Sequence, residues 1–343
     1  MKPLAGLAVA VAVIAADTRA HGAPAPGPVA DRYEFAAAHM GTTARIVLYA
    51  MGRSEAEAAA QAAFARIGEL DARLSDYRAD SEVSLLGQGA GGPAVALSHD
   101  LLAVLARAQE IARRSDGAFD VTVGPLSRLW RRARRLAELP SSEDLQAALA
   151  LVGHDALSLD TAARSARLER PGMRLDLGGI AKGYAADEAL RTLRGHGFER
   201  ALVTLGGEVV AGSPPPGRDG WTVAVATPGA ARAPLSLREA AASTSGDAEQ
   251  WVEIGGRRYS HIFDPRTGRA LEGRRSVTVV AREGILADAL ATALSVLGPA
   301  HGRAVVESFP GAEALWVEGG EVVTASAGWS ALPRVLEAAH VTP

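Results

Sequence analysis

The stretch Leu175-Asp-Leu-Gly-Gly-Ile-Ala-Lys-Gly-Tyr-Ala-Ala-Asp187 places two adjacent glycines before a lysine and the start of an expected helix. The chain uses arginine almost everywhere, and its only other lysine is Lys2. A compact ammonium in an arginine-rich chain suggests a role that a broad guanidinium would fill badly. Glycines that let a ligand approach the backbone, followed by a helix N-terminus, can hold phosphate. A strand that ends in a glycine turn beside a solvated lysine fits the same stretch.

Strand and helix patterns alternate on both sides of this stretch. Apolar spacing predicts helices over 55–74, from Ser98 to about 115–117, from Ser141 or Ser142 to Gly153, over 180–193 and over 286–297. Strands are expected over 33–49, 173–175, 201–205, 221–226 and 277–280, with hairpins at 157–168 and 315–323. Hairpins interleaved with helices favour an α+β fold, with mixed or antiparallel sheets and packed helices, over a doubly wound parallel sheet.

The N-terminus predicts an exported protein. Residues 1–20 have the positive start, apolar run and small-residue processing site of a signal peptide, residues 21–32 suggest a flexible tether, and 33–340 would form one domain. We expect no later membrane-spanning segment, and therefore a soluble periplasmic protein. The chain has no cysteine, which excludes disulfides, thiolate metal sites and a lipid-modified cysteine. The formal net charge is −3 and no basic stripe is evident, so we expect no nucleic acid partner.

A carboxylate and a hydroxyl lie four residues apart on one expected helix, at Asp288 and Thr292. Residues at this spacing share a helix face, and their oxygens suit Mg²⁺, although two ligands do not complete a site. An early-helix aspartate and a threonine bonded to a backbone carbonyl would give the same pattern.

Other polar clusters are weaker signals. His261 lies in Ser260-His-Ile-Phe-Asp-Pro-Arg-Thr-Gly268, where it suits a base or a phosphate ligand, or else a structural hydrogen bond in a turn. Segments 243–247 and 116–120 each combine carboxylates with turn-forming residues, which caps and turns also do. The Gly-rich nucleotide-binding signatures and HExxH are absent from the sequence, so a phosphate-handling site here must follow another design.

Taken together, these segments resemble the ApbE family of flavin transferases (FAD:protein FMN transferases). The resemblance covers nearly all of 34–297 and follows the family's order. Its segments are His39–Thr42, Leu74–Tyr77 with Asp80–Val83, Asp116–Asp120, Leu175–Tyr184, Leu205–Gly207, Ser245–Asp247, Ser260–Gly268, and Ala287–Asp288 with Thr292.

The resemblance implies an ApbE-like, T-fold-like architecture and an exported Mg²⁺-dependent enzyme. This enzyme would take FAD as substrate, release AMP and place FMN on an exposed threonine of an acceptor redox flavoprotein. By similarity, His261 would carry the transfer with Lys182 in support, and Mg²⁺ would be bound by Asp288, Thr292 and a backbone carbonyl placed at Ala181. The residues expected to hold the flavin nucleotide are Met40, Tyr77, Ala118, Phe119, Asp120, Asp176, Ser245, Gly246, Asp247 and Ile262.

Two alternatives remain at this stage. An FAD pyrophosphatase would use water in place of the threonine, on the same metal site, and would release FMN and AMP. A flavin-binding or scaffolding protein would need no turnover, although Asp288, Thr292 and His261 are all present. Ala248 stands where many relatives of the family carry an aromatic residue, which affects only local nucleotide contacts.

Overall fold

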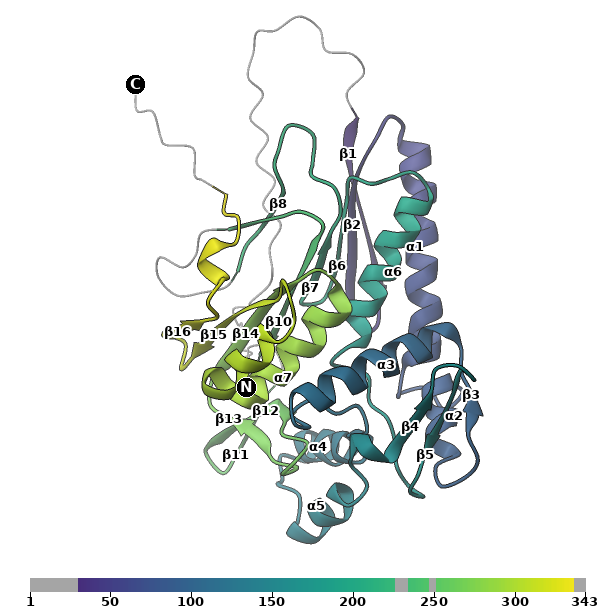
Figure 1. Ribbon diagram of the computed structural model, residues 1–343, viewed down its shortest axis with the longest axis vertical. Helices are drawn as coiled ribbons and strands as arrows, with labels where there is room; N and C mark the ends of the chain where they lie inside the picture. Colours follow the sequence, from purple (N-terminus) through teal and green to yellow (C-terminus); the bar gives the residue numbers. More distant parts are fainter. Residues whose placement is uncertain (1–29, 226–233, 247–250, 336–343) are drawn as a thin grey trace, which may run out of the picture.

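The computed structural model describes residues 30–225, 234–246 and 251–335 (Figure 1). Within these residues the main sheet has eight strands in the order β1-β2-β6-β7-β10-β14-β15-β16, and every neighbouring pair is antiparallel. The strands are β1 (Asp31–His39), β2 (Thr42–Ala50), β6 (Ala201–Leu205), β7 (Glu208–Ala211), β10 (Ala240–Gly246), β14 (Arg275–Ala281), β15 (Glu313–Glu318) and β16 (Val322–Ala325).

Alternation along the strands gives this sheet two apolar faces. In β2, Ile46 and Leu48 belong to the core beneath three helices, whereas Val47 belongs to the core of the opposite face. The helices are α1 (Arg53–Leu74), α6 (Ala181–Gly195) and α7 (Gly284–Glu307), which contact the strands of one face. The other face is covered by β8 (Trp221–Val223), β9 (Leu235–Leu237) and the 3-10 helix at Trp329–Ala331.

Smaller elements complete the molecule below the helical layer in Figure 1. One group contains α2 (Glu82–Gln88), α3 (His99–Arg114), a 3-10 helix (His154–Ala156) and the sheet of β3 (Val95–Ala96), β4 (Leu157–Asp160) and β5 (Ser165–Leu168). The other contains α4 (Gly124–Leu136), α5 (Ser142–Leu149), which packs on α4, and the sheet of β11 (Trp251–Ile254), β12 (Arg257–Phe263) and β13 (Ala270–Glu272). Trp130 of α4 packs against Tyr259 of β12 and joins this second group together.

The α+β prediction is confirmed, and most expected elements are present. Ser98 caps α3 by accepting a hydrogen bond from the backbone N–H of Leu101. The expected helix over 286–297 ends where α7 kinks, at Gly298 and Pro299, because the backbone of Gly298 is not helical. Hairpins form at 157–168 and 313–325, as the patterns indicate.

Other expectations were wrong in detail. Residues 173–175 form an isolated bridge between Arg174 and Val123 rather than a strand, because no second strand lies beside them. Two helices, α2 and α4, were not expected, and β8 ends at Val223. Strand β1 begins at Asp31, inside the expected tether, because its pairing with β2 extends to Ala50. The proposed signal peptide and most of the tether lie outside the described residues.

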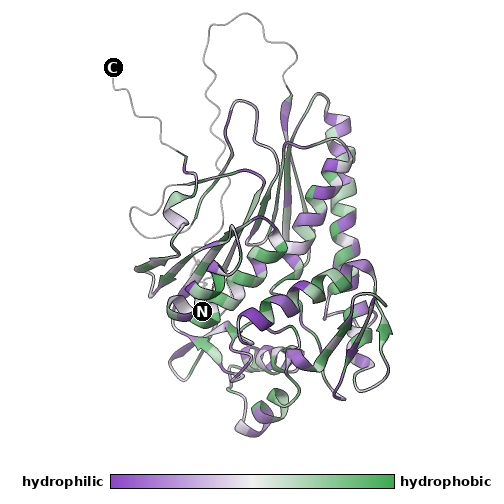
Figure 2. Ribbon diagram, in the orientation of Figure 1, coloured by the Kyte–Doolittle hydropathy of each residue, from purple (hydrophilic) through white to green (hydrophobic). Residues whose placement is uncertain are grey.

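Helix α7 is the core helix of the domain. Among the described residues it alone is long and apolar enough to cross a membrane, which differs from our expectation that no segment after the leader could do so. However, 67% of its most apolar window is buried inside the protein, as in the core helix of a soluble protein. Figure 2 shows this helix as mostly hydrophobic, whereas α1 carries both kinds of residue.

Candidate active site

A cavity of about 730 Å³ lies where the helical layer meets the smaller elements, and most of the predicted site residues line it. Segments that are far apart in the sequence form its wall, because turns and strand ends of the main domain and of the smaller elements meet at this cavity. The predicted residues that line it are Met40, Tyr77, Ala118, Phe119, Asp120, Asp176, Ala181, Lys182, Ser245, Gly246, His261, Ile262, Asp288 and Thr292. Asp247 lies outside the described residues.

The polar centre of the cavity is formed by Lys182 and the two α7 residues. Asp288 Oδ2 accepts a hydrogen bond of 2.9 Å from the backbone N–H of Gly183 and lies 3.8 Å from Lys182 Nζ. Lys182 Nζ also donates to the carbonyl of Gly178 at 3.2 Å. The lysine therefore folds back over its own turn and faces α7, and it is not a freely solvated side chain.

Two glycines allow this close approach. A Cβ on Gly179 would lie 2.9 Å from Thr292 Oγ1, which shows that the hydroxyl of Thr292 faces the turn. A Cβ on Gly183 would lie 2.8 Å from the Cβ of Asp288 and would also clash with the backbone of Gly284. Helices α6 and α7 can therefore touch here only because both positions lack a side chain.

The same centre buries a second carboxylate, Glu208 of β7. Its Oε1 lies 3.4 Å from Lys182 Nζ, and its Oε2 has no hydrogen-bond partner. Burial, and then the charge of Asp288, raises the pKa of Glu208, while burial also raises the pKa of Asp288. Burial opposes the charged form of Lys182, but the attraction of Asp288 and Glu208 outweighs it and raises the lysine pKa. Two buried carboxylates thus share one cation.

This set of atoms fits a divalent metal ion with hard-oxygen preference. No group of three or more His, Cys, Asp or Glu side chains with metal-binding geometry occurs in the part of the chain that the structure describes. Mg²⁺ commonly takes only one or two carboxylates, and completes its shell with water and substrate phosphates. Asp288, the Thr292 hydroxyl and the Glu208 oxygen without a hydrogen-bond partner match this pattern, because all three residues carry hard oxygen donors and line the same cavity.

His261 enters the cavity from β12, next to buried Ile262. Alternation along the strand places Ser260 on the other face, where its hydroxyl accepts a hydrogen bond from the backbone N–H of Ile262. This arrangement excludes a direct Ser-His relay between the two neighbours, as the sequence predicts. The strand is supported from below by Trp130, whose indole N–H donates to the carbonyl of Gly268 at 2.7 Å.

Aromatic residues and Asp120 form another part of the cavity wall. Phe119 is buried, and the carboxylate of Asp120 accepts two hydrogen bonds of 2.7 Å from the backbone and hydroxyl of Thr122. Burial raises the pKa of Asp120 in spite of these bonds. The Tyr77 ring is 78% exposed, so the cavity opens to solvent at this residue.

Arg131 of α4 is a site residue that sequence analysis missed. It bonds Asp76 at 2.5 Å and Asp176 at 2.8 Å, and its guanidinium carbon lies 4.2 Å from the centre of the Tyr77 ring. It thereby joins three segments of the cavity wall. Nothing in the sequence marks this arginine among its neighbours, whereas Glu208 directly follows the Leu205-Gly-Gly207 segment that we did single out.

Comparisons with known proteins agree with this geometry. A sequence profile of the ApbE family matches residues 40–316. The FAD:protein FMN transferase of Treponema pallidum (strain Nichols) is 35% identical over 328 residues, which cover 90% of this chain and 91% of the relative. A second relative of the same name, from Klebsiella pneumoniae (strain 342), is 34% identical over 291 residues, covering 83% of this chain and 89% of the relative.

Solved structures give the same result. The flavin transferase ApbE from Vibrio cholerae superposes with a TM-score of 0.78 at 30% identity, covering 88% of this chain and 99% of that one. The apo form of the flavinyl transferase ApbE from Pseudomonas stutzeri gives a TM-score of 0.79 at 32% identity, covering 89% and 97%. Sequence and fold agree over nearly the whole described chain, and this protein belongs to the ApbE family.

Proposed function

We propose that this protein is an FAD:protein FMN transferase, which moves FMN from FAD to a threonine hydroxyl of an acceptor protein and releases AMP. The observation that carries the proposal is the position of Asp288 and Thr292 against the glycine-lysine turn, in one cavity with His261. The names of the relatives support the same activity. The matches cover 91% and 89% of the length of these relatives, so the proposal concerns the complete reaction.

The chemistry requires the charge of a diphosphate to be neutralised before an oxygen can attack it. A Mg²⁺ ion held by Asp288 and Thr292, with a main-chain oxygen at Ala181, would supply most of this neutralisation. The ammonium of Lys182 supplies the rest, and its raised pKa keeps it charged at neutral pH. Asp176 orders the turn itself, because its Oδ1 accepts the backbone N–H of Gly178 at 2.8 Å.

In the transfer step the threonine oxygen forms a bond to the phosphorus on the FMN side of the diphosphate. The bond between that phosphorus and the bridging oxygen breaks, and AMP leaves with the bridging oxygen. The threonine proton passes to His261, since histidine titrates near neutral pH and can serve as a general base. Met40, Tyr77, Phe119 and Ile262 provide the apolar and aromatic surface for the flavin nucleotide.

We further propose that the chain works outside the cytoplasm after removal of residues 1–20. This proposal rests on the sequence of the leader and on the absence of cysteine, which removes lipid attachment at the processing site. Measuring the N-terminus of the protein recovered from a periplasmic extract tests it. An intact Met1 in that fraction would contradict the processing step.

A direct assay tests the reaction. The protein is incubated with FAD, Mg²⁺ and a candidate acceptor domain, and covalent flavin is detected by fluorescence in a denaturing gel, with AMP measured in parallel. Fluorescence on the acceptor is the expected result. Free FMN with AMP but no labelled acceptor would identify a pyrophosphatase instead, and no AMP at all would leave a binding protein.

His261 is tested in the same assay. His261→Ala should abolish flavin transfer while FAD binding, followed by quenching of flavin fluorescence, is retained. Unchanged transfer by His261→Ala would remove the residue from the mechanism. Loss of FAD binding would show that its role lies in holding the substrate.

A further inference from the structure

Helix α4 carries five arginines and no acidic residue in the sequence Gly-Pro-Leu-Ser-Arg-Leu-Trp-Arg-Arg-Ala-Arg-Arg-Leu. The helix presents three adjacent stripes, each with i, i+4, i+7 spacing. Leu126, Trp130 and Ala133 form the buried stripe, and Ser127, Arg131 and Arg134 line the cavity. The third stripe, which we call the outer arginine stripe, is exposed and consists of Arg128, Arg132 and Arg135.

The outer arginine stripe borders the mouth of the cavity. Each of its residues follows a cavity-lining residue by one position, which is a rotation of about 100° around the helix. Tyr77, which stacks on Arg131 at this edge, is mostly exposed, so the cavity is open beside the stripe. The structure thus corrects our expectation of no basic stripe, because the three residues align only once α4 forms.

Within the described residues, the three arginines have no ion pair or hydrogen bond. Leu136 and Leu139 follow them on the surface and are 47% and 49% exposed. Arginine with exposed apolar side chains is typical of surfaces that bind other proteins. The unpaired guanidinium groups select a partner with carboxylates at matching positions.

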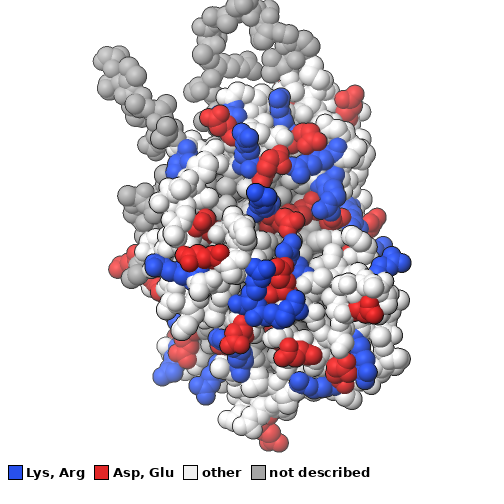
Figure 3. Space-filling model, in the orientation of Figure 1, with Lys and Arg blue, Asp and Glu red and all other residues white. Residues whose placement is uncertain are grey.

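We propose that the outer arginine stripe docks an acidic segment of the acceptor protein, next to the threonine that receives FMN. This inference rests on the proposed transfer to a protein. The stripe spans the eight residues from Arg128 to Arg135, or about 10 Å of helix, which equals about three residues of extended chain. It therefore fits a short acidic peptide segment. A nucleic acid or membrane needs a broader positive surface, and Figure 3 shows both signs of charge interspersed on the face that it displays.

Direct binding tests the inference without any chemistry. The probe is a fluorescently labelled redox domain with one exposed threonine flanked by acidic residues, and its dissociation constant is measured by anisotropy without FAD. The test variant is Arg128→Glu, Arg132→Glu and Arg135→Glu combined. The matched control is Arg113→Glu, Arg238→Glu and Arg303→Glu, which changes the net charge equally at exposed positions that do not line the cavity.

We expect the test variant to weaken binding by about tenfold or more at low salt, and the control to bind as the wild type does. Changing the acidic residues beside the acceptor threonine of the probe to amides should weaken its binding to the wild type as much as the three arginine substitutions do. The same change in the probe should not weaken binding to the test variant any further. High salt should reduce the difference, since the screening length is then short. Thermal unfolding of both variants checks that they are folded.

Several results would overturn the inference: equal binding by test variant and wild type, equal loss in the control, or no binding of the probe to the wild type. The stripe would be assigned to a membrane surface if the wild type bound phosphatidylglycerol vesicles and the test variant lost this vesicle binding but still bound the probe. AMP release by the wild type is measured separately. If the wild type released no AMP but still bound the probe through the outer arginine stripe, the proposed transfer would be wrong and the docking surface would stand.

Discussion

At the residue scale, the proposed metal site depends on a small number of oxygen atoms. Asp288 and Thr292 come from one face of α7 and meet the turn at Gly179 and Lys182. A methyl group in place of the Thr292 hydroxyl would fill the same space, so the packing of the helix does not need the oxygen. Its oxygen therefore tests the metal site more directly than the buried charges do.

Thr292→Val keeps the shape of the side chain and removes the oxygen. We expect about a hundredfold loss of AMP release at fixed Mg²⁺, because a ligand that acts on the diphosphate is missing, with partial recovery at higher Mg²⁺. Ser295→Ala is the control, since Ser295 lies on the same helix, bonds the carbonyl of Ala291 and does not line the cavity. Equal activity of Thr292→Val and wild type would exclude the residue as a ligand.

A substitution of Lys182 can distinguish the effect of its charge from the effect of its shape. Its Nζ lies within 3.8 Å of three oxygens, on Gly178, Glu208 and Asp288, where a point charge fits and a planar fork does not. Lys182→Arg should therefore lower AMP release by about tenfold or more although the charge is kept. AMP release measures the activity of the variant, and urea unfolding checks that its stability is unchanged. Full activity of the arginine variant would show that only the charge matters.

The sequence predicts this centre well and its surroundings poorly. Residues in quoted segments, such as Lys182, His261 and Asp288, gather in one cavity, because the N-terminal turns of α6 and α7 and strand β12 all line it. Glu208 enters through the pairing of β7 with β10, and Arg131 through the position of α4. Both depend on tertiary placement, which local patterns do not contain.

At the element scale, the contact of α6 with α7 brings the lysine turn to the helix that carries Asp288 and Thr292. Periodicity predicts both helices, but their crossing point is set by Gly183 and Gly284, whose backbones touch. Helix α4 escaped prediction because its arginines obscure an apolar stripe of only three residues, Leu126, Trp130 and Ala133. The strand expected over 173–175 does not form, because β-propensity alone does not make a strand and only an isolated bridge lies beside these residues.

Gly183→Ala tests this contact. The added methyl would clash with the backbone of α7, so we expect a loss of about 1–3 kcal/mol in the free energy of unfolding, together with lower activity. Gly195→Ala is the matched control at the end of the same helix, where no atom lies within 4 Å of the added methyl. That control should be neutral or slightly stabilising. Similar urea midpoints for the two variants would contradict the close contact.

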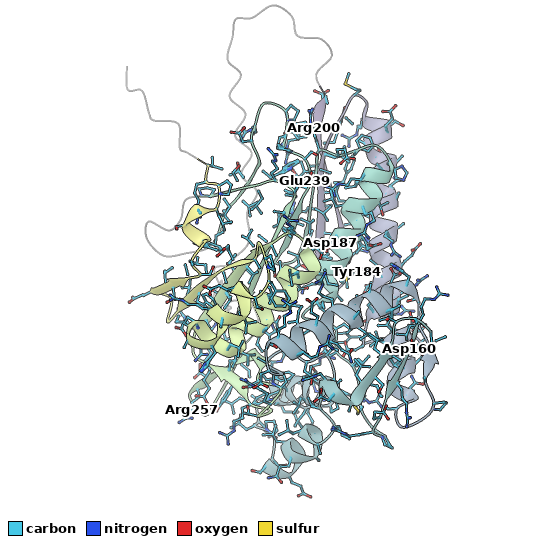
Figure 4. All side chains as sticks on the ribbon, viewed as in Figure 1. Asp160, Tyr184, Asp187, Arg200, Glu239 and Arg257 are labelled. Carbon is cyan, nitrogen blue, oxygen red and sulfur yellow. The ribbon has the colours of Figure 1, made fainter. Side chains whose placement is uncertain are left out.

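Asp187 of α6 caps the start of α7 (Figure 4), and its raised pKa predicts that the stability of the domain depends on pH. Its carboxylate accepts the N–H groups of Gly284 and Ile285 at 2.7 and 2.9 Å, yet burial raises its pKa from 3.8 to about 6. The folded state thus holds a proton that the unfolded state releases above pH 3.8. This contribution to stability is complete below that pH and is lost as the pH rises through 6, by about 3 kcal/mol at most.

Asp187→Asn removes the titration. Because the neutral amide resembles the protonated acid, the variant should be about as stable as the wild type at pH 4 and become the more stable of the two at pH 7, by about 3 kcal/mol at most. Urea unfolding of both proteins across this range measures the difference. A difference that stays constant with pH would show that Asp187 keeps its ordinary pKa in the folded protein.

At the scale of the whole molecule, the cavity is the place where the main sheet, the helical layer and the α4 group meet. Its wall runs from Met40 to Thr292 in the sequence, so a bound ligand contacts segments that would otherwise separate on unfolding. A ligand that binds only the folded state stabilises it by mass action, and at about 100 times its dissociation constant the gain is about 2.7 kcal/mol. FAD should therefore stabilise the entire domain.

We expect FAD with Mg²⁺ to raise the thermal midpoint by several degrees in a single cooperative transition, monitored by circular dichroism. Part of the rise should disappear with EDTA, because the metal and the diphosphate bind to each other as well as to Asp288 and Thr292. Thr292→Val should lose that metal-dependent part and keep the rest, which comes from contacts of the flavin with the far wall of the cavity. A rise that is unaffected by EDTA in the wild type would show that FAD binds without the metal. Two separate transitions, with only one raised by FAD, would mean that the ligand contacts a single layer, and the cavity would then not be the site.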